Sequence, residues 1–107
     1  MRGTVPIHVG ATAVAGARRA GRLGDGYLPF ERDLDRLAVL IGEMRGAAEA
    51  AGRDPDAIEI TSMGSTTPAK VQAMVRLGVS RMLFFADDVA ALRELARRAG
   101  DAVATLP

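Results

Sequence analysis

Apolar positions along the chain change their spacing four times, from short continuous or alternating runs to a helical spacing and back. The short runs occupy residues 6–10, 25–29, 58–63 and 81–86. After each of them, apolar residues recur three and four positions apart, a spacing that places them on one side of a helix. The pattern therefore predicts four strands, each followed by a helix.

The helix that follows the second strand, over 33–51, has the clearest apolar stripe. Its members are Leu34, Leu37, Ile41, Met44, Ala48 and Ala51. Asp33 can cap its start and Gly52 can end it. The other helices are expected over 12–23, between Thr67 and Gly78, and between Asp87 or Asp88 and Gly100. Gly24 is expected to take the left-handed conformation after the first helix, and Thr67 to cap the third.

Strands that alternate with helices of this length predict a parallel sheet with helical crossovers. We expect the strands to lie side by side in chain order, with the helices on one face of the sheet. The run "RMLFFA" at 81–86 is continuously apolar, as in a strand that is buried on both faces. The fold class is α/β, with four βα units in one domain over residues 1–107 and no linker.

Composition excludes several classes of site and partner. The chain has no Cys and one His, His8, so Cys-ligated and multi-His metal sites are excluded and we expect no metal. Fourteen basic and thirteen acidic residues give a net charge of +1, which is not the basic excess of a nucleic-acid binder. No apolar run is long enough for a membrane span. We expect a cytoplasmic protein with no nucleic-acid or membrane partner.

The turn after the first strand, Gly10-Ala11-Thr12, is the candidate binding site. The first N–H groups of a helix are free, and the helix dipole favours an anion there. Gly10 and Ala11 would allow close approach, and the Thr12 hydroxyl could donate to a phosphate. The alternative interpretation is a tight turn with Thr12 as an ordinary N-cap.

Other side chains leave two interpretations open. His8 could donate a proton or hydrogen bond to a ligand, or it could be a satisfied residue on a strand face. Tyr27 could stack on a flat ligand or pack between strand and helix. The cluster of Arg18, Arg19 and Arg22 could steer an anionic cofactor or form a solvated helix face.

Three stretches together resemble the luciferase-like monooxygenase family. They are "PIHVGATAVAGARRAGRLGDGYLPF" (6–30), "AAEAAGRDPDAIEIT" (47–61) and "LGVSRMLFF" (77–85). The resemblance implies an oxidoreductase or monooxygenase that uses FMN or the deazaflavin coenzyme F420. The arginines and "GDG" of the first stretch favour the deazaflavin branch without excluding FMN.

The resemblance also implies a fold and a site. Members of the family are TIM (β/α)8 barrels, and these stretches belong to the C-terminal half of the barrel, so the chain is expected to be a truncated, partial luciferase-like domain. The family lines the cofactor phosphate with two glycines and a Ser-like residue, which correspond to Gly10, Ala11 and Thr12 here. Ala11 departs from the second glycine. Tyr27 stands where the family often has Trp.

A half barrel would expose two sheet edges and the inner face of the sheet, which we expect to be apolar. The expected partner is a second copy, giving a homodimer, or a separate N-terminal half. The chain is thus expected to be the C-terminal portion of an FMN- or F420-dependent oxidoreductase that contributes the phosphate site. The alternative is a non-catalytic remnant or assembly domain that keeps the fold without the chemistry.

Overall fold

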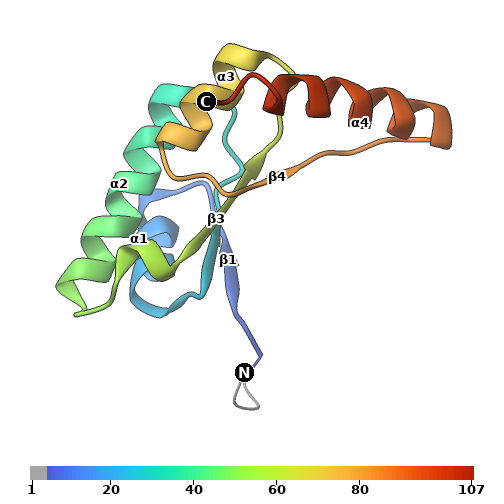
Figure 1. Ribbon diagram of the computed structural model, residues 1–107. Helices are drawn as coiled ribbons and strands as arrows, with labels where there is room; N and C mark the ends of the chain where they lie inside the picture. Colours follow the sequence, from blue (N-terminus) through green and yellow to red (C-terminus); the bar gives the residue numbers. More distant parts are fainter. Residues whose placement is uncertain (1–4) are drawn as a thin grey trace.

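The four predicted strands form one sheet in a computed structural model, in which residues 5–107 are described (Figure 1). They are β1 (His8–Gly10), β2 (Gly26–Leu28), β3 (Glu59–Met63) and β4 (Arg81–Leu83). The order is β1-β2-β3-β4, and every neighbouring pair is parallel. The predicted parallel sheet and its strand order are confirmed.

A helix follows each strand. The helices are α1 (Val14–Leu23), α2 (Leu34–Ala50), α3 (Pro68–Arg76) and α4 (Val89–Val103), with a short 3-10 helix, η1 (Pro55–Ala57), before β3. Asp33 and Asp88 cap α2 and α4, because their carboxylates accept the N–H groups of Asp35 and Ala91. Gly52 and Gly78 end α2 and α3 with φ of +73° and +97°, a conformation that favours glycine.

Two details of the predicted helix ends are wrong, and a third is confirmed only in part. Gly24 has a φ of −84°, and the Arg53 guanidinium instead binds the carbonyls of Gly21 and Gly24 at 2.6 and 2.7 Å. Gly100 does not end the last helix, because α4 continues to Val103. Thr67 is the N-cap residue of α3, as predicted, but its side chain makes no capping hydrogen bond.

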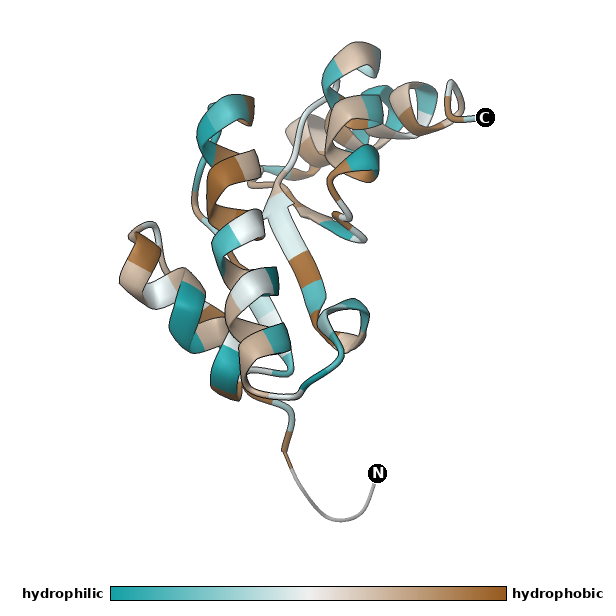
Figure 2. Cartoon of the chain, turned by 90° about the vertical axis from the view of Figure 1, so that its left-hand side faces the viewer, coloured by the Kyte–Doolittle hydropathy of each residue, from teal (hydrophilic) through white to brown (hydrophobic). Residues whose placement is uncertain are grey.

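The hydrophobic core lies between one face of the sheet and helices α1, α2 and α3. Figure 2 shows hydrophobic segments, in brown, on the helices and on the strand beside them. The strands contribute Tyr27 and Ile60, and α2 contributes the largest group of buried side chains, which are Leu37, Leu40, Ile41, Met44 and Ala48. The predicted placement of the helices on one face of the sheet is therefore confirmed for the core.

Helices α1 and α2 approach each other very closely at Gly21. A Cβ atom at this position would overlap the carbonyl oxygen of Met44 and would lie 2.9 Å from the backbone nitrogen of Ala48. Neither backbone atom can move without shifting α2. Glycine is therefore required for the packing of α1 against α2.

The last βα unit is packed more loosely than predicted. Arg81 is exposed, Met82 is half-buried and the Phe85 side chain is 72% exposed, so the strand is not buried on both faces. Helix α4 extends beyond the sheet (Figure 1) and buries only Ala102. An edge strand with one poorly covering helix cannot bury the whole apolar run.

The helix-free face of the sheet was expected to be apolar, and this is wrong at its N-terminal end. His8, Glu59 and Arg81 form a polar cluster there: His8 Nε2 lies 3.9 Å and Arg81 Nη2 3.2 Å from Glu59 carboxylate oxygens. A Cβ atom at Gly26 would overlap the His8 ring, so this glycine lets the imidazole lie across β2. His8 is thus a residue on a strand face with a polar partner, as its second interpretation proposed.

Replacing Gly21 with Ala should destabilise the fold by about 1–3 kcal/mol, because the added methyl group must displace backbone. Urea unfolding followed by circular dichroism measures this change. Gly46→Ala is the matched control, since a Cβ atom at Gly46 meets nothing within 4 Å, and it should stabilise the protein by up to about 1 kcal/mol. An unchanged or higher midpoint for Gly21→Ala would contradict the packing described above.

Candidate functional site

The carboxyl ends of all four strands lie at one edge of the sheet, and the loops that follow them gather there. In parallel βα folds this edge is where ligands bind. Gly10 is the last residue of β1, and Ala11 and Thr12 lead to α1. The structure thus places the three predicted site residues at this edge.

The N-terminus of α1 carries no side-chain cap. Its N-cap residue is Ala13, and its first turn, Val14 to Gly16, has no acidic residue. The N–H groups of that first turn have no partner within the helix. The interpretation of Thr12 as the N-cap is therefore wrong, and its exposed side chain precedes a helix end that is open to an anion.

The backbone of Ala11 is held by the neighbouring strand. Its N–H donates to the carbonyl of Leu28 at 3.2 Å, and its carbonyl accepts from the Tyr27 hydroxyl at 3.4 Å. A Cβ atom at Gly16 would overlap that of Ala11, so the turn folds back onto the first turn of α1. The pairing of Ala11 with Leu28 extends the strand contact past Gly10 and delays the start of the helix. The Ala11 N–H is consequently not available to a ligand.

Arg36 brings a positive charge to this turn. Its Nη2 donates to the carbonyl of Thr12 at 3.4 Å, although the two residues belong to different βα units. Arg36 lies in the first turn of α2, where the helix dipole disfavours a cation. A cation in the first turn of a helix is unfavourable, and this placement could have indicated a role for Arg36 from the sequence. Arg36 was not among the predicted site residues.

Tyr27 packs into the core and does not stack on a ligand. Its side chain is completely buried, which settles the choice left open by the sequence. Burial raises the pKa of the Tyr27 hydroxyl to about 12, while the nearby charge of Arg36 acts in the opposite direction. The exposed aromatic ring beside the turn belongs to Phe30, whose Cε2 would lie 3.1 Å from a Cβ atom at Gly10.

The arginine cluster of α1 is divided between two roles. Arg18 forms an ion pair with Glu43 at 2.7 Å and so links α1 to α2. Arg19 and Arg22 are exposed. The cluster therefore contributes one structural contact and a solvated helix face.

Two cavities open near the same edge, beyond β3 and β4. One has a volume of about 340 Å³ and the other about 80 Å³. Both are lined by Arg32, Met63, Gly64 and Ser65. Gly10, Ala11 and Thr12 line neither of these two cavities.

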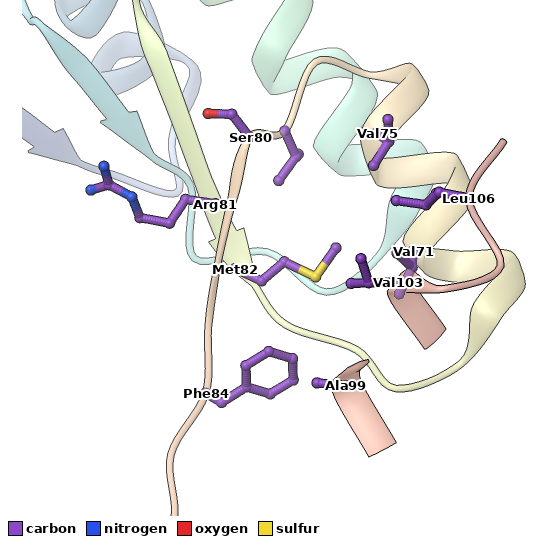
Figure 3. A pocket seen from close by; sticks show the side chains of 10 residues that line it. Val71, Val75, Ser80, Arg81, Met82, Phe84, Ala99, Val103 and Leu106 are labelled. Carbon is purple, nitrogen blue, oxygen red and sulfur yellow. The ribbon is translucent and has the colours of Figure 1, made fainter. Parts of the chain in front are cut away.

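A third cavity, of about 250 Å³, lies between α3, β4 and α4 (Figure 3). Val71, Met82, Phe84 and Val103 surround it, and Arg81 points away from it in the close-up. It has an apolar lining and lacks converging polar groups, so it is best explained by the incomplete packing of α4.

Residues 5–107 contain neither a metal-binding cluster nor a membrane-spanning helix. No group of three or more His, Cys, Asp or Glu side chains is placed to hold a metal ion. No helix in this part of the chain is long and apolar enough to cross a membrane.

The sequence belongs to the luciferase-like monooxygenase family, whose model matches residues 1–105. It is 39% identical over 59 residues to an F420-dependent glucose-6-phosphate dehydrogenase of Mycolicibacterium gilvum, and 44% identical over 50 residues to an F420-dependent hydroxymycolic acid dehydrogenase of Mycobacterium tuberculosis. These matches cover 53% and 47% of this chain but only 18% and 14% of the relatives. The chain thus matches less than a fifth of either relative's length.

Solved structures support the fold. The coenzyme F420-dependent tetrahydromethanopterin reductase of Methanopyrus kandleri superposes with a TM-score of 0.52 at 19% identity, over 68% of this chain and 22% of that one. A riboflavin lyase with modified FMN and riboflavin superposes with a TM-score of 0.51 at 22% identity, over 70% of this chain and 18% of that one. At this level of identity the likeness establishes the arrangement of βα units alone.

The raised pKa of Tyr27 predicts that the protein loses stability as the pH rises from 10 to 12. Between the unfolded-state and folded-state pKa values, the Tyr27 hydroxyl is protonated in the folded protein but ionised in the unfolded chain. Its contribution to the free energy of unfolding is therefore fully present below pH 10, and it is lost as the pH rises through the folded-state pKa. Tyr27 is the only Tyr and there is no Trp, so tyrosinate absorbance reports on this group alone. Ionisation with a midpoint near 10 in the folded protein would contradict the burial of Tyr27.

Proposed function

We propose that this chain is the part of a luciferase-like oxidoreductase that binds the phosphate group of FMN or coenzyme F420. The proposal is supported by family membership and by the F420-dependent relatives. The observation that carries it is the uncapped N-terminus of α1 beside the Arg36 guanidinium. When bound, the flavin or deazaflavin ring would supply hydride-transfer chemistry.

The groups at the turn fit a phosphate. Thr12 is exposed and offers a hydroxyl donor, and the first N–H groups of α1 offer further donors. The Phe30 ring lies beside Gly10, where a Cβ atom would be, and so borders the turn. Arg36 supplies positive charge and orients the Thr12 carbonyl, so that this acceptor is turned toward the guanidinium. No acidic side chain in the first turn of α1 opposes the anion.

The alternative role, an assembly domain without chemistry, is favoured by one observation. The N–H of Ala11 already pairs with Leu28, so the turn offers one donor fewer than an open glycine turn would. The two roles differ in one measurable property, because the assembly domain would show no affinity for either cofactor.

We also propose that catalysis requires a partner. The matched relatives are several times longer than the aligned segments, and both edge strands of this sheet, β1 and β4, have an unpaired side within residues 5–107. Unpaired edges favour association. A second copy of the chain or a separate N-terminal half would cover them.

Thr12→Ala should weaken the binding of FMN and of coenzyme F420 about ten- to a hundredfold, since one hydroxyl donor to a charged group contributes roughly 1.5–3 kcal/mol. Fluorescence titration measures the affinities, with the partner half present if one exists. Thr12→Ser keeps the hydroxyl and is the matched control, with affinity close to wild type. Equal affinities for wild type and Thr12→Ala would exclude the hydroxyl from the site.

Ala13→Asp should change stability and binding in opposite directions. The N-cap residue has an extended backbone, with φ −98° and ψ 154°, so a carboxylate there can accept the first-turn N–H groups and stabilise the protein by about 1 kcal/mol. The same carboxylate would occupy the donors that the phosphate needs. Ala13→Ser is the uncharged control, which should stabilise the helix with a smaller loss of binding. A Tm increase with unchanged cofactor affinity would place the phosphate elsewhere.

Light scattering of the purified chain should give a mass above the 11.2 kDa of one chain, because the edges of β1 and β4 favour pairing. Repeating the measurement across a range of protein concentrations separates a defined dimer from progressive aggregation. A monomer that stays monomeric at high concentration and unfolds cooperatively would count against the need for a partner.

A further inference from the structure

Two adjoining cavities at the carboxyl edge of the sheet share one wall. The larger, of about 340 Å³, reaches β4 and α4, and the smaller, of about 80 Å³, reaches α3. Arg32, Met63, Gly64 and Ser65 line both. The larger volume is within the usual range of small-molecule sites.

The smaller cavity brings together two positive charges, Arg32 and Lys70. Neither has an ion-pair partner among residues 5–107, whereas Arg18, Arg45 and Arg81 each do. Two cations that line one cavity without a carboxylate between them repel each other, and an anion bound there would relieve the repulsion.

Within residues 5–107, the carboxylates next to Arg32 in sequence form no ion pair with its guanidinium. The Glu31 carboxylate accepts the backbone N–H groups of Arg32 and Asp33 at 3.1 and 3.2 Å. The Asp33 carboxylate accepts the N–H of Asp35 at 3.0 Å as the cap of α2. Both carboxylates are therefore engaged with backbone, and Arg32 lines both cavities.

The remaining lining combines a hydroxyl donor with apolar surface. Ser65 Oγ accepts the N–H of Thr67 at 3.1 Å, which leaves its own proton to donate. The larger cavity adds the hydroxyl of Thr66 and the apolar side chains of Leu83 and Phe85. A ligand that fits both cavities has an anionic end and an apolar or neutral body.

We propose that Arg32, Lys70 and Ser65 form a second anion subsite, which binds the phosphate or carboxylate of the substrate. The identification of the ligand as the substrate rests on the proposed function, whereas the anion subsite itself does not. The subsite is separate from the cofactor turn, because Gly10, Ala11 and Thr12 line neither cavity.

The test is a titration of the full chain with inorganic phosphate at constant ionic strength, followed by the backbone amide signals in two-dimensional NMR. The amides of Ser65 and Thr66 should shift and saturate. Arg32→Gln and Lys70→Gln should each weaken this response about tenfold or more, as expected for the loss of a charged hydrogen-bond donor. Arg22→Gln is the control, because it removes the same charge from an exposed position on α1, and it should leave the response unchanged.

A parallel titration with FMN separates this proposal from the proposed function. We expect Arg32→Gln to bind FMN as wild type does, with shifts in the first turn of α1. Phosphate shifts confined to Val14, Ala15 and Gly16, or shifts at Ser65 that survive both Gln substitutions, would overturn the second subsite. Saturable phosphate binding at Ser65 without FMN binding would support the subsite while contradicting the proposed function.

Discussion

The parallel pairing of the four strands is the constraint on which the rest of the structure depends. Since each strand runs in the same direction, each must be followed by a helix that returns the chain to the start of the next strand. Every loop that follows a strand therefore reaches the same edge of the sheet. This is why the turn at Gly10 and the loops that carry Arg32 and Ser65 lie at one edge, although they are distant in sequence.

Strands that lie in chain order and are joined by crossovers of one hand place the core helices on one face of the sheet. The opposite face is divided between polar and apolar positions. At its N-terminal end, Glu59 pairs with Arg81 and lies near His8, with Gly26 providing the space for the imidazole. A face covered by charged groups that are already paired with one another is less aggregation-prone than a wholly apolar one. A partner that covers this face must provide polar groups for the cluster as well as apolar contact.

The sequence was sufficient for features set by local spacing, and insufficient for those set by contacts between units. The caps at Asp33 and Asp88 and the helix ends at Gly52 and Gly78 follow from nearby residues. The strand order was predicted from the alternation of strands and helices and from the family resemblance. The position of Gly10, Ala11 and Thr12 at the strand end was likewise predictable. The bond of Ala11 to Leu28, the contact of Arg36 with Thr12 and the capping of α1 by Arg53 join residues 17 to 32 positions apart, and no local pattern specifies such contacts.

The central claim is that the turn after β1 recognises a phosphate group, and the most direct measurement compares FMN with riboflavin, which has the same ring system without the phosphate. Calorimetric titration of the chain, with its partner half if one exists, gives both affinities. The account predicts that FMN binds at least about tenfold more tightly, the effect of one or more charged hydrogen bonds. Equal affinities would show that the turn contributes nothing to recognition of the phosphate and would contradict the account.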